Sequence, residues 1–306
     1  MKKLILAAAV AAVTTGSVNA ATVYEGKGLK YDLKGDWQVQ FRQKKGENKD
    51  SNIEFDDLEL KNRVTYELSD GMKAFGQMDF GFKDAADDKQ TGSDLEEAYL
   101  GMNFGQVSAQ FGKMDFVTDS FGVEASVEEA EDDAFDFQKV SGGNVIRVDA
   151  NFDNIYVGAS TELEAKADSG NEDSSVDLFV VADLDVAEVG AAYQSYEDSN
   201  SNSVDTWGVM ASFDAGFATL AVDYSSADDK VDVYNLVASF KLDKTTKAAV
   251  GYNNTEENNA DDVGTWYANV TYKFPAQKNV SVFAEIANSD EDNSDMGYLA
   301  GMRIKF

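Results

Sequence analysis

The sequence contains no cysteine and no histidine. Without cysteine there is no disulfide framework, no zinc–thiolate site and no thiol nucleophile. Without histidine there is no imidazole metal ligand and no histidine general base for catalysis near neutral pH. No phosphate-binding glycine loop, nucleophile elbow or paired-carboxylate motif stands out, and no acidic stretch has the spacing of an EF-hand calcium loop. We therefore expect no enzyme activity, no metal site and no cofactor.

Basic residues are scarce, with 26 Lys+Arg against 56 Asp+Glu and a formal net charge of −30. This surface would repel a polyanion, so we expect no nucleic-acid partner. Proline is nearly absent, with one residue against 24 glycines, and 19 Phe and 13 Tyr are present. That composition favours many strands joined by Gly/Asn/Asp turns. A share of 43% apolar residues in regular alternation argues against disorder.

Long apolar runs are also missing, since a membrane-spanning helix needs roughly 20 such residues. The one apolar stretch near the start is shorter, from Leu4 to Val13, and follows the basic Met1-Lys2-Lys3. Val18-Asn19-Ala20 then has the small-x-Ala pattern of a cleavage site. We predict a secretory signal peptide over residues 1–20 and a single domain over residues 21–306.

The remainder alternates apolar and polar residues with a period of two, which predicts strands with one apolar and one polar face. In the last strand one face carries Tyr298, Ala300, Met302, Ile304 and Phe306, and the other carries Leu299, Gly301, Arg303 and Lys305. The same pattern recurs along the chain and predicts sixteen strands. They are expected at 35–43, 58–69, 72–83, 95–104, 107–113, 144–152, 155–164, 175–184, 187–197, 204–213, 217–225, 231–241, 247–254, 264–274, 280–288 and 296–306.

The connections between these strands alternate in length. Tight turns are expected at 69–71, 105–106, 153–154, 214–216 and 275–279. Longer, mostly acidic connections are expected at 44–57, 84–94, 114–143, 165–174, 198–203, 255–263 and 289–295. An even strand number with short turns on one side and long loops on the other is typical of a transmembrane antiparallel β-barrel.

A secreted soluble β-sandwich or barrel would also alternate. Its apolar face would be a packed core of large side chains, whereas this face mixes Ala and Gly with aromatic residues near strand ends. The aromatic residues suit the two girdles of a membrane barrel. They are Trp37, Tyr66, Trp207, Trp266, Tyr272 and Tyr298. Both observations favour the membrane barrel.

Two stretches resemble the general diffusion porins of Gram-negative outer membranes, in particular the porin-like proteins of marine gamma-proteobacteria. They are 21–35 and 98–113, the second containing Ala98-Tyr99-Leu100-Gly101-Met102-Asn103-Phe104-Gly105 and Phe111-Gly112-Lys113. The resemblance covers essentially the whole chain after residue 20. It implies a homotrimer of sixteen-stranded barrels in the cell outer membrane, each with the third long loop folded into the lumen. Phe306 resembles the terminal signal that such proteins present to the outer-membrane assembly machinery.

The third long loop is the candidate pore constriction, because the charges at the narrowest point set a channel's selectivity. It carries nine acidic residues against one base, Lys139. Its aromatic pair, Phe135 and Phe137, is predicted to hold the loop against the wall. A solvated surface loop is the alternative interpretation. The candidate constriction residues are Asp115, Asp119, Glu124, Glu128, Glu129, Asp132, Asp133 and Asp136.

A basic wall is predicted opposite this loop, because several basic residues fall on the polar row of their strands. The candidates are Arg42, Lys61, Arg63, Lys113 and Arg147. Lys113 departs from the family pattern, which often has Arg there, and strict alternation puts it on the outward row of Phe111. A bulge is needed to turn it inward. The alternative for Lys61 and Arg63 is local pairing with Glu59 and Glu67.

These features predict a water-filled, cation-preferring channel for passive diffusion of small hydrophilic solutes and ions. One alternative is a substrate-selective channel for sugars or anions, and another is a non-conducting adhesin or structural barrel. The expected partners are other copies of the chain, outer-membrane lipid and lipopolysaccharide. Acidic loops could bridge divalent cations to lipopolysaccharide phosphates, although such runs more often keep a loop hydrated.

Overall fold

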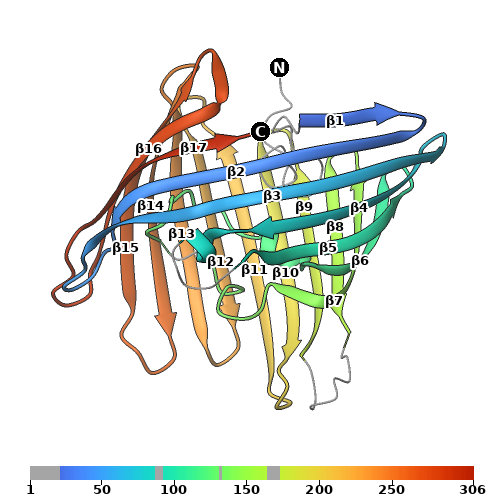
Figure 1. The fold of residues 1–306 in the computed structure, drawn as a ribbon. Coiled ribbons are helices and arrows are strands. Elements are labelled where there is room, and N and C mark those ends of the chain that lie inside the picture. Colours follow the sequence, from blue (N-terminus) through green and yellow to red (C-terminus); the bar gives the residue numbers. More distant parts are fainter. Residues whose placement is uncertain (1–20, 87–91, 131–132, 164–172) are drawn as a thin grey trace.

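The structure is a computed structural model that describes residues 21–86, 92–130, 133–163 and 173–306. The predicted signal peptide, residues 1–20, lies outside these ranges. The described residues form one curved wall of strands around an interior, with two short helical turns in the connections (Figure 1). Within these ranges, no helix is long and apolar enough to cross a membrane.

Seventeen strands and two short helical turns follow one another along the described chain. The strands are β1 (Ala21–Gly26), β2 (Leu29–Gln43), β3 (Ser51–Ser69), β4 (Met72–Gly81), β5 (Asp94–Asn103), β6 (Val107–Asp115), β7 (Ser141–Phe152), β8 (Ile155–Glu162), β9 (Ser174–Asp183), β10 (Ala187–Glu197), β11 (Ser203–Asp214), β12 (Thr219–Ala227), β13 (Val231–Lys241), β14 (Thr246–Glu257), β15 (Val263–Phe274), β16 (Gln277–Ser289) and β17 (Gly297–Lys305). The helical turns are α2 (Lys83–Ala86) and the 3₁₀ turn η1 (Val117–Ser120).

Strands β2 to β17 close into a ring of sixteen. Each pairs antiparallel with the next along the chain. Pairing of β17 with β2, from Tyr298 with Gln43 to Lys305 with Asp36, completes the circle. Closure leaves no free sheet edge around the ring, which is what a bilayer requires of a strand structure. The predicted sixteen-stranded antiparallel barrel is therefore confirmed.

The start of the barrel differs from the prediction, which began the first strand at residue 35. The ring strand β2 begins at Leu29, and β1 adds a seventeenth strand that pairs with its first residues. Lys27 and Gly28 form the two-residue turn between them and both have positive φ, 54° and 77°. Two consecutive positive φ values are the geometry of a tight hairpin whose twist matches the flanking strands.

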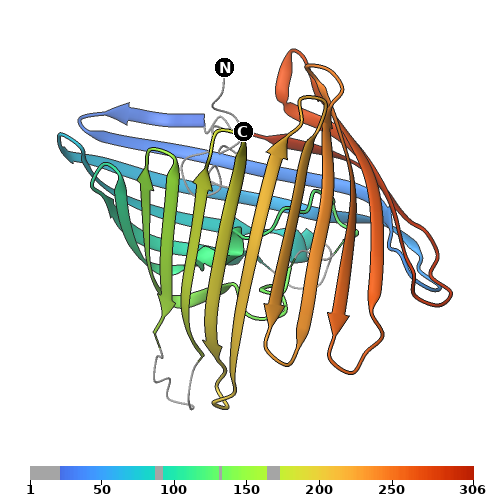
Figure 2. The ribbon, with the colours of Figure 1, turned by 180° about the vertical axis from the view of Figure 1, so that it is seen from behind.

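The two ends of the barrel carry different connections, as predicted (Figures 1 and 2). At the end that holds the C-terminus, the strands are joined by turns of two to four residues: 70–71, 104–106, 153–154, 184–186, 215–218, 242–245 and 275–276. We call this the turn end. The connections at the opposite, loop end are mostly longer, and the longest joins β6 to β7 through residues 116–140.

The distribution of apolar and polar side chains is the reverse of that in a soluble protein. Large apolar side chains on the outward row are exposed, including Leu100 and Phe111 at 60% each. Polar side chains on the inward row are buried, including Gln38 at 1% and Gln194 at 0%. Exposed apolar bands of this size are costly in water and favourable in lipid. The girdle residues Trp37, Tyr66, Trp207, Trp266 and Tyr298 are also outward, with exposures of 38–49%.

The last residue, Phe306, lies at the seam, the junction where β17 pairs with β2 and closes the barrel. The backbone of Phe306 exchanges two hydrogen bonds with Gly35, at 2.8 and 3.0 Å. Its ring stands edge-on to Trp37 with centroids 5.4 Å apart. A Cβ at Gly35 would lie 2.2 Å from the Phe306 ring, so only glycine leaves room for it.

We predict that Phe306→Ala lowers the temperature at which the barrel unfolds. The variant loses a ring contact of about 1 kcal/mol together with apolar burial at the seam. Gel mobility of heated and unheated samples in SDS measures the folded fraction. Phe274→Ala is the matched control, because Phe274 forms a similar edge-on pair with Tyr272 at 5.3 Å but lies beside a turn. An equal effect of both substitutions would contradict a special role for the seam.

Candidate functional site

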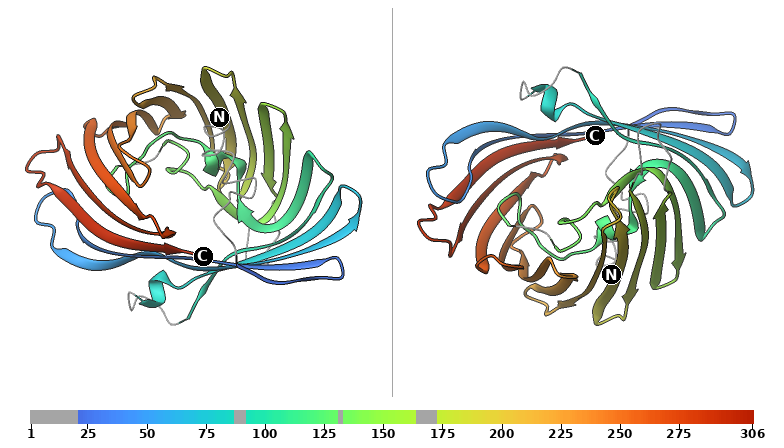
Figure 3. Two further views of the ribbon diagram at one scale, coloured as in Figure 1. Left: turned by 90° about the horizontal axis from the view of Figure 1, so that it is seen from above. Right: turned by 90° about the horizontal axis from the view of Figure 1, so that it is seen from below.

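Residues 116–140, which we call the third loop, run along the inner surface of the barrel (Figure 3). In views along the barrel axis, this segment crosses the interior between the strand walls. Its side chains and amides contact inward-row residues of β8, β12 and β16 among other strands. Residues 131 and 132 are not among those described, so the predicted constriction residue Asp132 is not placed.

Apolar side chains attach the third loop to one half of the wall. Phe121 and Phe135 form one cluster with the inward residues Tyr156, Phe179 and Met210. A second cluster joins Ala134 and Phe137 to β11, β12 and β13 through Val204, Ala227, Val231 and Val233. A barrel interior is otherwise polar, so these patches specify where the loop lies. Both members of the predicted aromatic pair take part in these contacts.

The carboxylate of Glu285 on β16 holds the bend of the loop. It is 1% exposed and also accepts a 2.9 Å hydrogen bond from Asn269 on β15. Its two oxygens accept four hydrogen bonds from loop residues 126–129 at 2.6–3.1 Å. The donors are the Ser126 hydroxyl and the backbone amides of Val127, Glu128 and Glu129. Three successive amides aimed at one anion form a strong, charge-assisted contact.

Arg42 on β2 clamps the same bend from the other side. Its guanidinium lies 2.7 Å from Glu128 Oε2 and 2.6 Å from Glu129 Oε1, and it donates to the Glu128 carbonyl at 2.7 Å. Glu54 adds a longer contact of 3.5 Å. Two predicted constriction residues are thus paired with a predicted wall residue, and the pairing fixes the loop across the interior.

Arg147 on β7 fixes the root of the loop. Its guanidinium donates to the carbonyl oxygens of Asp115 and Phe116 at 3.1 and 3.2 Å. It also lies 3.1 Å from Asp149 Oδ1, and Asp149 in turn accepts from Tyr156 at 2.6 Å. The Arg147 side chain is therefore buried and neutralised, and it positions the loop rather than presenting a free charge.

The remaining wall candidates have different environments. Lys61 is neutralised by Asp79 at 2.6 Å and by Glu97 at 3.3 Å, a pairing within the wall. Arg63 donates to the neutral amide of Gln77 at 2.9 Å and lies 4.2 Å above the Phe75 ring. The described residues provide no carboxylate within ion-pair distance of Arg63, so it keeps its charge toward the interior.

Lys113 does not belong to the wall. It pairs with Ala98 in regular register, and the irregularity nearby comes from one extra residue on β7, not from β6. It therefore stays on the outward row of Phe111, where its ammonium donates to the Leu95 carbonyl at 2.5 Å. The assumed inward turn is wrong because a bulge on the partner strand does not change the alternation of β6.

The other acidic residues of the loop separate into two groups. Asp133 is 4% exposed and caps the amide of Phe135 at 2.7 Å, so it faces into the loop itself. Asp119 and Asp136 are exposed, and Glu124 is half-buried. Although its side chain contacts solvent, Asp119 lies inside the barrel, where the surrounding protein weakens its hydration. This raises the pKa of Asp119 to about 7, and the charges of Asp115 and Asp136 add to the effect. Burial, with Asp223 nearby, likewise raises the pKa of Glu124 to about 7.

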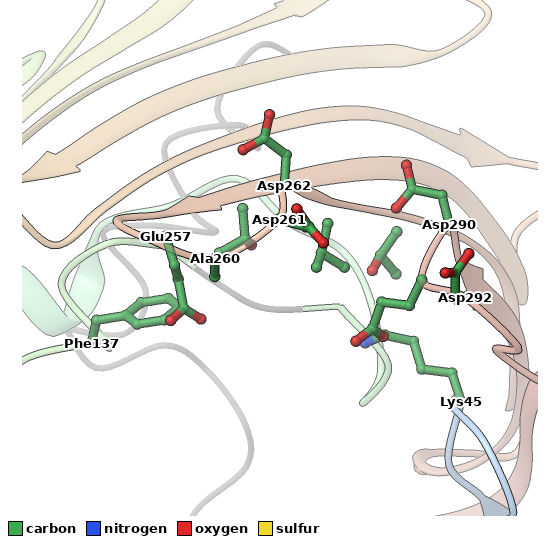
Figure 4. Close-up of a pocket in the computed structure, with 12 residues that line it drawn as sticks. Lys45, Phe137, Glu257, Ala260, Asp261, Asp262, Asp290 and Asp292 are labelled. Atoms are coloured by element: carbon green, nitrogen blue, oxygen red, sulfur yellow. The ribbon is translucent and has the colours of Figure 1, made fainter.

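At the loop end, acidic residues from distant parts of the sequence surround a pocket of about 700 Å³ (Figure 4). Phe137 of the third loop lines its base, and Lys45 is the one basic residue among the lining residues described. Six carboxylates from the end of β14 and from the β14–β15 and β16–β17 loops are among the other lining residues. They are Glu257, Asp261, Asp262, Asp290, Glu291 and Asp292. We call this region the acidic vestibule.

The structure also contains a cluster of three carboxylates that was not predicted. Glu59, Asp79 and Glu96 bring three ligand oxygens within 4.8 Å of one another on the wall of β3, β4 and β5. The ammonium of Lys61 already lies against Asp79 at 2.6 Å. This internal cation offsets part of the charge that would attract a metal ion.

Sequence reasoning also missed the residues that receive the loop. Besides Glu285, they include Asp223, which accepts from the Val123 amide at 2.8 Å, and Tyr267, which accepts from the Ala125 amide at 2.8 Å. Ser225 accepts from the Ala134 amide at 2.9 Å. The signal available was their place on the inward row. Nothing in the sequence indicated which loop residue each would bind.

Comparison with known proteins gives the same architecture. The family model described as Gram-negative porin matches residues 7–294. Porin-like protein H of Photobacterium profundum is 31% identical over the full length of both chains. In fold, the chain is similar to a trimer form of OmpT from Vibrio cholerae, with a TM-score of 0.75 and 17% identity over 92% of this chain and 100% of that one.

OmpF of Salmonella typhi is also similar in fold, with a TM-score of 0.73 and 16% identity over 92% of this chain and 99% of that one. The family match covers nearly the whole length. It agrees with the closed ring of strands, the apolar exterior and the polar interior. The chain therefore belongs to the Gram-negative porin family, whose barrels form outer-membrane channels for passive diffusion.

Proposed function

We propose that this porin prefers cations as it passes small hydrophilic solutes and ions along their concentration gradients. The observation that carries the proposal is that carboxylates neutralise most of the predicted basic wall, whereas acidic side chains remain exposed along the route. Arg42, Lys61 and Arg147 are each neutralised by carboxylates at 2.6–3.1 Å. Asp119 and Asp136 remain exposed on the third loop.

The acidic vestibule supports the same preference, because six carboxylates there face one lysine. Charges of one sign in a low-dielectric mouth raise the local concentration of counter-ions. Arg63 opposes this effect as a single unneutralised guanidinium on the wall. An anion channel would need several such groups along the constriction, so the cation preference is favoured.

We also propose that the working form is a homotrimer, as the trimer form of OmpT suggests. Contacts with lipopolysaccharide and with the barrel assembly machinery stay predictions. So does the role of Phe306 as an assembly signal, although its contacts at the seam give it a separate structural role.

Reconstitution of the purified porin tests the channel function. In planar bilayers we expect step-like currents whose size rises with salt concentration. In liposomes loaded with an impermeant polymer, we expect swelling in small sugars at rates that fall with solute size. A barrel that gives neither currents nor swelling would contradict the proposal and favour a plugged structural barrel. Saturable swelling with one sugar alone would favour a substrate-selective channel.

A further inference from the structure

A second pocket lies inside the barrel, on the turn side of the third loop. Its volume is about 390 Å³, and loop residues 119–125 form one side. The other side consists of residues from the turn-end halves of β10, β11, β12 and β13, including Glu188, Ser212, Thr219 and Ser239. We call this the inner pocket. A solute coming from the turn end reaches it before it reaches the loop.

Glu188 is the unusual residue of the inner pocket. The side chain is only 9% exposed, and its Oε2 atom has no hydrogen-bond partner among the described residues. A buried carboxylate without donors loses its hydration and gains nothing in exchange, which is costly. Most other buried carboxylates of the interior have donors, as Glu285 and Asp149 do. The Oε2 atom of Glu188 therefore has an unmet hydrogen-bonding capacity beside the inner pocket.

The charge of the pocket indicates the sign of a partner for Glu188. Asp119 and Glu124 line it together with Glu188, whereas none of the lining residues described is Lys or Arg. Among the described residues, the group of three carboxylates close enough to share a metal ion lies elsewhere, at Glu59, Asp79 and Glu96. The acidic groups of the inner pocket are more widely spaced and suit a cation larger than a bare metal ion.

The rest of the lining indicates the body of the ligand. Phe121, Val123 and Met210 provide apolar surface, and Ala221 and Val237 extend it. Hydroxyls of Ser120, Ser212, Thr219 and Ser239 lie among them. An ammonium group has three donors and no acceptor, which complements carboxylates and hydroxyls, and a short alkyl body complements the apolar walls.

We propose that the inner pocket binds organic ammonium cations with a small apolar body, with Glu188 as the anchoring carboxylate. The proposal names a class of solute for the proposed cation-preferring channel. Only its electrical test depends on that channel function. Binding can be measured separately on the purified porin. Failure of the channel and failure of the pocket are thus distinguishable.

The probe is n-butylammonium, compared with n-butanol, which has the same body without charge, and methylammonium, which has the charge without the body. We expect butylammonium to interrupt single-channel current more when it is added at the turn end. Glu188→Gln should shorten the interruptions about tenfold, since hydrogen bonds to charged groups are strong. Glu124→Gln is a second variant on the opposite side of the pocket. Glu197→Gln on the same strand is the matched control and should change nothing.

Calorimetric titration of the detergent-solubilised porin measures binding without any current. The proposal is supported if butylammonium binds more tightly than both reference compounds and Glu188→Gln weakens it while Glu197→Gln does not. Equal binding of butanol, or equal binding to the Glu188→Gln barrel with its heat-modifiable fold intact, would overturn it. A porin that carries no current but binds butylammonium through Glu188 would contradict the proposed function and leave the pocket standing.

Discussion

Replacing Glu285 with alanine is expected to release the bend of the third loop and to enlarge the open channel. The Glu285 carboxylate accepts four hydrogen bonds from residues 126–129, and three of the donors are backbone amides. Hydrogen bonds to a charged group contribute about 1.5–3 kcal/mol each. Alanine removes all of them and leaves the amides of Val127 and Glu128 without this acceptor, whereas the Glu129 amide still donates to the Ser126 hydroxyl at 2.9 Å. The bend then keeps the ion pairs of Arg42 on the other side, the contacts of Lys45 with Glu129, and the hydrogen bond from Asn269 to the Ala125 carbonyl.

Single-channel recording measures the effect as a higher and noisier conductance than that of the unmodified porin. Glu285→Gln is the matched control, because it keeps the size of the side chain and one acceptor oxygen and should have a smaller effect. The barrel itself should still form, since Glu285 lies within a strand whose backbone pairing does not involve its side chain. An alanine variant with unchanged conductance and noise would mean that the bend does not limit the pore.

Lowering the pH is expected to weaken the cation preference strongly. Burial raises the pKa values of Asp119 and Glu124 to about 7, well above those of free carboxyl groups. Both groups are ionised at about pH 8 and mostly protonated at about pH 6. Two negative charges on the third loop are therefore lost over a range in which carboxylates with ordinary pKa values stay ionised.

The zero-current potential in a KCl gradient measures this change. As the pH falls from about 8 to about 6, the potential should shift toward the value expected for an anion-selective channel. The shift should be clearest at low salt, because salt screens fixed charge. The double variant Asp119→Asn with Glu124→Gln should have a smaller pH dependence over this range, and the remainder should come from groups such as Glu128, whose pKa burial also raises to about 7. Asp290→Asn with Asp292→Asn is the control at the vestibule and should keep most of the pH dependence. A double loop variant that titrates like the unmodified porin would refute the assignment.

Alternation made the barrel predictable, because each strand faces lipid on one side and the polar interior on the other. The strand ends were less predictable. β3 begins at Ser51, seven residues before the predicted start. The prediction differed because Asp56 and Asp57, both acidic, were assigned to the preceding loop. In the structure they face basic side chains: Lys83 lies 3.5 Å from Asp56, and Arg303 pairs with Asp57. The hairpin at Lys27 and Gly28 was missed because lysine rarely adopts positive φ.

The candidate site was predictable in composition and not in pairing. The acidic loop and the inward arginines stand out in the sequence, and the structure brings Arg42 together with Glu128 and Glu129. Those pairs join residues 86 and 87 positions apart, and Glu285 meets the loop from 156 to 159 positions away. Such distances have no sequence spacing to detect. Ion pairs neutralise Arg42, Lys61 and Arg147, so Arg63 is the member of the predicted basic wall that keeps its charge toward the interior. The remaining balance of charge favours cations.

The measurement that tests the cation preference most directly is the zero-current potential of the unmodified porin in a KCl gradient at low ionic strength and about pH 8. The exposed carboxylates of the third loop and the acidic vestibule should let potassium cross faster than chloride. The dilute side should therefore become positive relative to the concentrated side. A dilute side that becomes negative would show that chloride crosses faster and would contradict the account.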